Sequence, residues 1–220
     1  MGNIYPSKGR GISMKKLFAT AALIAAFIIS PMASAGVSGS VGLESDRFWR
    51  GMNMSDGTSL ELDLMVDYEG WFAGGKVMKG ASSLGHEMSD ELNTMVYAGY
   101  GLSLTDDWSV RAGIVSYDWD MLPESFEEAV VGGSYKGLDL DYYMNVDNSD
   151  STYLELGYTL PYISVVDLEL NYGRFDDGED VVGLTISKDV GQWGFSLMVL
   201  EEARHGEFMD SASLGFHYNF

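Results

Sequence analysis

The chain has 220 residues, no cysteine, and 33 acidic against 13 basic residues, which gives a formal net charge of −20. This acidity disfavours nucleic acid and anionic surfaces as partners. The absence of cysteine excludes disulfides, thiolate metal sites and a cysteine nucleophile, and the length suits one domain.

The first segment with a clear pattern is a secretory signal. Lys15 and Lys16 precede a long apolar stretch, which ends on the small residues Ala33-Ser34-Ala35. We therefore expect residues 1–35 to be an N-terminal extension and a cleaved signal peptide, and residues 36–220 to be the mature domain. Within 36–220 no apolar run approaches the roughly 18 residues of a membrane helix, so a membrane-embedded mature protein must be a β-barrel.

The mature part alternates large apolar with small or polar residues at a period of two, which is typical of β-strands. Leu60, Leu62, Leu64 and Val66, for example, alternate with acids. The pattern predicts twelve strands, at residues 37–53, 58–68, 71–78, 92–104, 108–118, 127–135, 138–146, 152–160, 163–173, 181–188, 193–200 and 211–220.

The predicted connections alternate between longer polar loops and short turns. The short ones read EG, TDD, KG, PY and DVGQ, and the longest loop covers residues 79–91, whose glycines and serines would let it fold inward. Outer-membrane barrels have short periplasmic turns and longer external loops. The sequence thus predicts an all-β, antiparallel, up-and-down transmembrane β-barrel of about twelve strands, located in the bacterial outer membrane.

Aromatic residues gather at the short-turn end of the predicted strands, on the apolar parity. Such rings prefer the membrane interface. We expect a lipid-interface girdle there, and Trp49 and Tyr172 would belong to the opposite, outer girdle. The residues of the first girdle are Trp71, Trp108, Tyr135, Trp193 and Phe220.

Both ends of the mature part resemble the corresponding segments of known outer-membrane barrels. The segment "LGFHYNF" resembles their closing strand, with an aromatic last residue. Residues Val41 to Asp46, Arg50, Gly51 and Ser55 to Gly57 match the opening of the TorF-family porins, where Val-Gly-Leu-x-Ser-Asp-x-x-x-Arg-Gly leads into Ser-Asp-Gly. This resemblance implies an outer-membrane barrel of pore function, and it supplies no site residues.

If the apolar parity faces lipid, the opposite parity lines the lumen, which would be acidic. Acidic rings favour cations. We therefore expect a porin-like channel for passive diffusion of small hydrophilic solutes, with cation preference. A closed structural or adhesion barrel acting through acidic loops is the alternative, because the carboxylates could simply pair with Lys76 and Arg111. The expected pore-lining residues are Glu44, Arg50, Glu61, Asp63, Asp67, Lys76, Arg111, Asp139, Asp141, Glu155, Asp167 and Glu169.

A barrel hydrolase is a third hypothesis. Nucleophilic hydrolysis would need a serine and a histidine within hydrogen-bond reach of each other. His86, His205 and His217 lack the His-x-Ser spacing of outer-membrane phospholipases. The sequence predicts no catalytic residue, metal or cofactor. Expected partners are outer-membrane lipid and lipopolysaccharide, small polar solutes, and the barrel-assembly machinery, which would bind the C-terminal strand.

Overall fold

The computed structural model describes residues 36–55, 57–80, 92–119, 125–148, 151–161, 165–204 and 207–220. The predicted extension and signal peptide, residues 1–35, lie outside these ranges. Among the described residues, no helix is long and apolar enough to cross a membrane.

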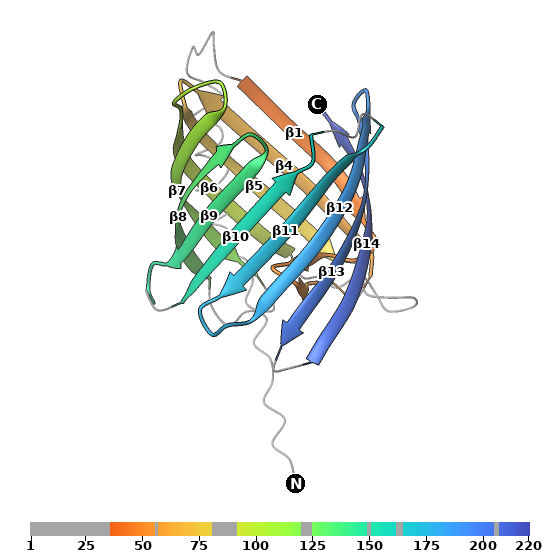
Figure 1. Cartoon of the computed structure of the whole chain (residues 1–220). Coiled ribbons are helices and arrows are strands. Elements are labelled where there is room, and N and C mark those ends of the chain that lie inside the picture. The colour runs from red at the N-terminus through yellow and green to blue at the C-terminus, as the bar shows by residue number, and fades with distance from the viewer. Residues whose placement is uncertain are drawn as a thin grey trace. The chain divides into compact units, whose positions relative to one another are not determined.

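The described residues form a closed antiparallel β-barrel, in which each barrel strand pairs with the barrel strands before and after it in the chain and β1 closes onto β14 (Figure 1). Within the described ranges the barrel has twelve strands, as predicted. They are β1 (Gly36–Glu44), β4 (Ser59–Tyr68), β5 (Trp71–Gly80), β6 (Leu92–Ser103), β7 (Trp108–Asp118), β8 (Phe126–Tyr135), β9 (Leu138–Asn145), β10 (Thr152–Thr159), β11 (Asp167–Phe175), β12 (Asp180–Val190), β13 (Trp193–Arg204) and β14 (Glu207–Asn219).

Two of the short turns are tight β-hairpins built by residues with positive φ. Glu69 and Gly70 have φ of 48° and 87°, and Lys136 and Gly137 have φ of 50° and 83°. This is the type I′ geometry, whose twist matches that of the flanking strands. The predicted turn at Pro161 is wrong in length, because β10 ends at Thr159 and β11 begins only at Asp167.

The outer face of the barrel is apolar along its strands. Ile114, Val131 and Leu214 are 46%, 57% and 62% exposed, and each alternates with an inward neighbour. An apolar surface of this extent fits lipid rather than water. The barrel thus has the architecture of bacterial outer-membrane proteins, in agreement with the predicted location.

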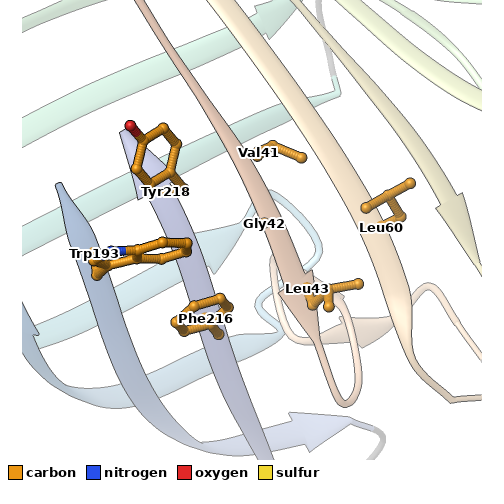
Figure 2. Close-up of a pocket in the computed structure, with 7 residues that line it drawn as sticks. All are labelled: Val41, Gly42, Leu43, Leu60, Trp193, Phe216 and Tyr218. Carbon is orange, nitrogen blue, oxygen red and sulfur yellow. The ribbon is translucent and has the colours of Figure 1, made fainter. Parts of the chain in front are cut away.

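A cavity of about 420 Å³ on this outer face lies across the β1–β14 seam. Figure 2 shows Trp193, Phe216 and Tyr218 on one side of it and Leu60 on the other, with the strand of Val41 and Leu43 between them. Its lining is almost entirely apolar, so it belongs to the lipid-facing surface and not to the lumen.

Candidate functional site

The chain between β1 and β4 forms a separate hairpin of two short strands, β2 (Phe48–Trp49) and β3 (Met52–Asn53). Arg50 and Gly51 form its turn, with φ of 50° and 83°. This pair reverses the chain in the same type I′ geometry as the barrel turns. The predicted first strand, residues 37–53, is therefore wrong beyond Glu44.

Hydrogen bonds at its base fix this hairpin to the barrel and to itself. The backbone N–H of Ser45 donates to the carbonyl oxygen of Leu214 at 2.8 Å, and the N–H of Leu214 donates to Ser45 Oγ at 3.0 Å. Across the hairpin, the N–H of Met54 donates to the carbonyl oxygen of Arg47 at 2.7 Å, and the N–H of Arg47 donates to Ser55 Oγ at 2.9 Å. The entry and exit of the hairpin are thus held together beside β14.

Trp49 packs into an aromatic cluster inside the barrel. Its ring lies edge-on to the rings of Trp119, Tyr117 and Phe126, with centroid distances of 4.5, 5.6 and 6.1 Å. Tyr117 and Trp119 are only 3% and 4% exposed. The expectation that Trp49 belongs to an outer lipid girdle is therefore wrong, because the hairpin turns its ring away from lipid.

Arg50 reaches the wall of the barrel and is held there by an ion pair and by contacts with aromatic rings. Its Nη1 and Nη2 atoms donate to the two carboxylate oxygens of Glu128 at 2.8 and 2.7 Å. Its guanidinium carbon lies 4.4, 4.5 and 4.2 Å from the ring centroids of Trp49, Tyr143 and Tyr153. Burial acts to lower the pKa of Arg50, but the hydrogen bond and charge of Glu128 outweigh it and hold this pKa above its ordinary value.

The hairpin thereby crosses the lumen. It starts between β1 and β4, whereas Glu128, Tyr143 and Tyr153 lie on β8, β9 and β10. In the closed order of twelve strands, β9 is five strands away from β4 and six away from β1, and β10 lies next to it. The hairpin tip therefore contacts the wall opposite its base. Sequence reasoning named loop 79–91 as the one to fold inward, and residues 81–91 lie outside the described ranges.

Two groups of ion pairs line the inner wall. In the first, Lys76 Nζ lies 2.6 Å from Glu61 Oε1 and 3.6 Å from Asp63 Oδ2, and Arg47 Nη1 lies 2.8 Å from Glu61 Oε2. Tyr97 also donates its hydroxyl to Asp63 at 3.2 Å. Glu61, Asp63 and Lys76 are predicted pore-lining residues, which the structure brings together on β4 and β5, whereas Arg47 comes from the chain before β2.

The second group lies on β7 and β9. Arg111 donates two hydrogen bonds to the carboxylate of Asp141 and lies 3.4 Å from Asp139 Oδ1. The closed-barrel alternative was based on ion pairs between the inward carboxylates and Lys76 or Arg111, and ion pairs of both residues are present. The paired carboxylates still outnumber the bases that hold them.

Other predicted lining residues form no ion pair with a described residue. Among the described residues, Glu44, Glu155 and Glu169 have inward parity and no ion pair within 4.0 Å. Asp67 and Asp167 are exposed near the short-turn end of β4 and β11. The predicted acidic lining is thus divided between ion-paired groups and isolated carboxylates.

The predicted girdle residues lie on the outer face near the short turns. Trp108 stacks on Tyr135 with a centroid distance of 4.4 Å, and Trp71 contacts Tyr100 at 5.0 Å. Trp193 stacks on Phe216 at 5.1 Å, and Phe220 is 53% exposed. Their place at a membrane interface remains a prediction. Tyr172, expected in the outer girdle, donates its hydroxyl to Asp180 at 2.7 Å.

Sequence reasoning missed Arg47, Glu128 and the aromatic cluster around Trp49 as parts of the lumen. As for the histidines, His86 and His205 lie outside the described ranges, and His217 Nε2 lies 3.4 Å from Asp189 Oδ1.

Comparison with known proteins shows the fold only. No family model and no curated protein matches the chain. Among solved structures, it is similar to the KdgM porin in complex with disordered oligogalacturonate, with 14% identity and a TM-score of 0.61 over 83% of this chain and 99% of that one. It is also similar to outer membrane phospholipase A from Escherichia coli, with 11% identity and a TM-score of 0.50 over 83% and 91% of the two chains.

Proposed function

We propose that the protein is a porin-like channel of the outer membrane that passes small hydrophilic solutes by diffusion and prefers cations. The observation that carries this proposal is the set of inward carboxylates that form no ion pair among the described residues, Glu44, Glu155 and Glu169. Fixed negative charge beside a low-dielectric wall concentrates cations and repels anions. The TorF-family resemblance and the fold shared with a named porin support the same function.

The test is single-channel recording in a planar bilayer. Residues 36–220, refolded and checked by heat-modifiable gel mobility, are added under a salt gradient of potassium chloride. Stable conductance steps with a cation-biased reversal potential are expected. Steps with an anion bias would contradict the cation preference while leaving the pore in place.

A closed structural barrel is the second candidate, and one observation favours it. The β2–β3 hairpin crosses the lumen and is tied to both walls. A folded protein that produces no conductance steps would support this candidate and overturn the channel. We further propose that outer-membrane lipid and lipopolysaccharide surround the barrel, and that the assembly machinery recognises β14.

A further inference from the structure

The apolar residues of the hairpin pack against one side of the lumen, whereas Arg50 also reaches β9 and β10. Trp49 and Met54 contact the buried cluster of Val115, Tyr117 and Trp119. Met95, Tyr97, Phe126 and Val130 pack against the same cluster. All of the barrel residues in this cluster come from β6, from β8, or from β7 and the residue that follows it. We call this inner wall, together with that of β5, the packed side.

Burial on the packed side leaves little room for solute. Met78 is 2% exposed, Val115 6% and Glu128 4%, and all three have inward parity on their strands. Side chains at such exposures have close neighbours on all sides. Water and ions therefore have no continuous route between the hairpin and this wall.

The inner wall of β12, β13, β14 and β1, which we call the small-residue side, has a different composition. Most of its inward positions in the middle of the strands are small or polar, with Met198 and Leu200 on β13 as larger exceptions, and several are only half-buried. Small side chains extend less far into the lumen, so they leave space there. The half-buried inward positions include Thr185, Ser187, Ser196, Ser211, Gly215 and Ser40.

A cavity of about 210 Å³ opens on the small-residue side, where β1 meets β14. Ser196 and Gly215 line it together with Glu44, Glu61 and His217. Glu44 forms no ion pair within 4.0 Å among the described residues, although Arg47 and Lys76 act on its carboxylate from a greater distance. The cavity is large enough to hold several water molecules, since each occupies about 30 Å³ in the liquid.

We infer that the permeation path runs along the small-residue side, past Thr185, Ser196 and Gly215, and that small cations pass Glu44 on the way. The packed side carries no current, because the hairpin fills it. This inference rests on the proposed channel function and assigns its route. In this arrangement the hairpin is a fixed partition, which closes the packed side of the lumen and leaves the small-residue side open to ions.

The chain is suited to a direct test because it contains no cysteine. Three single-cysteine variants are made: Thr185→Cys and Ser196→Cys on the small-residue side, and Met95→Cys on the packed side as the matched control. Each full chain is expressed in a bacterial host and extracted from the outer membrane. Each is then treated with a cationic methanethiosulfonate, and labelling is measured by the mass increase.

On modification, the single-channel conductance of Thr185→Cys and Ser196→Cys is expected to fall about twofold or more, because the reagent adds bulk and positive charge to a cation path. Met95→Cys should label at least about tenfold more slowly and keep its conductance, because residue 95 packs against the buried cluster of Val115, Tyr117 and Trp119, which leaves the reagent little room. Equal labelling of all three, or block through Met95→Cys alone, would overturn the inferred route.

Labelling and conductance separate the two proposals. If the unmodified protein is folded but passes no current, the channel function fails, while the labelling rates still report which half of the lumen is open to water. Heat-modifiable mobility of each variant identifies any that has not folded. For such a variant, Ser187→Cys replaces a small-residue position and Tyr97→Cys replaces Met95→Cys.

Discussion

Arg50 and Glu128 lie 78 residues apart in the chain and are joined by two parallel hydrogen bonds across the lumen. Their side chains are only 7% and 6% exposed. A bidentate guanidinium–carboxylate pair fixes orientation as well as distance. The pair therefore sets where the tip of the hairpin rests, and several predictions depend on it.

The first prediction concerns this ion pair. Glu128→Gln removes the charge that compensates buried Arg50, and breaking a buried pair in this way costs about 3 to 5 kcal/mol. Part of this cost is avoided if the hairpin leaves the wall, so the single-channel conductance should rise. Glu127→Gln is the matched control, because the neighbouring side chain is exposed. Equal conductance in both variants would show that the pair does not hold the partition.

The second prediction concerns ion selectivity. Arg111→Gln frees Asp139 and Asp141 from their positive partner, so the lumen becomes more negative and the reversal potential under a salt gradient should move further toward cations. Lys136→Gln is the control, because Lys136 lies in an exposed turn, 3.5 Å from Asp107. An unchanged potential in Arg111→Gln would show that the field of Asp139 and Asp141 does not reach ions on their path through the lumen.

The third prediction concerns an aromatic ring that covers a glycine. A Cβ atom at Gly74 would collide with the ring of Tyr97 and lie 2.6 Å from the carbonyl oxygen of Leu64. Gly74→Ala should therefore lower the free energy of unfolding in urea by about 1 to 3 kcal/mol, as overpacking does. At adjacent Gly75 the nearest atom would be 3.4 Å away, so Gly75→Ala should cost nothing. The reverse order would contradict this packing.

The fourth prediction concerns the lipid-facing surface. Ile114 lies in the middle of β7 and points outward. Ile114→Arg should destabilise the barrel in lipid vesicles by about 2 to 4 kcal/mol if this position lies near the bilayer midplane. Thr185→Arg introduces the same side chain on the lumen side and should leave the unfolding free energy close to that of the parent. Tolerance of both would mean that the outer face does not meet lipid.

The alternation of apolar and polar residues predicted the barrel strands because one face meets lipid along every strand. It failed between Glu44 and Asn53. A period of two continues through a tight hairpin, so the pattern cannot distinguish a strand that goes on from one that folds back. The dipeptide Arg50-Gly51 was the available signal, since glycine suits the positive φ at the second position of a type I′ turn.

The same error hid two lumen residues. With the first strand extended to residue 53, Arg47 fell on the lipid-facing parity and was passed over. Glu128 follows another acid, Glu127, so alternation could not decide which of the two faces inward. Contacts across the lumen between residues distant in sequence, such as Arg50 with Glu128, leave no periodic signal in the chain.

The β1–β14 seam also constrains how the barrel forms. Ser40 pairs with Asn219, so the contact that closes the cylinder joins the two most distant strands of the fold. The loop-closure entropy of such a contact is lost before its hydrogen bonds are gained, which slows folding. Until the last strand arrives, β1 presents an unpaired edge, and unpaired edges invite pairing with other chains. The chain is therefore most prone to aggregate before closure. The glycines and serines of β1 and β14 meet only when the rest of the sheet is complete.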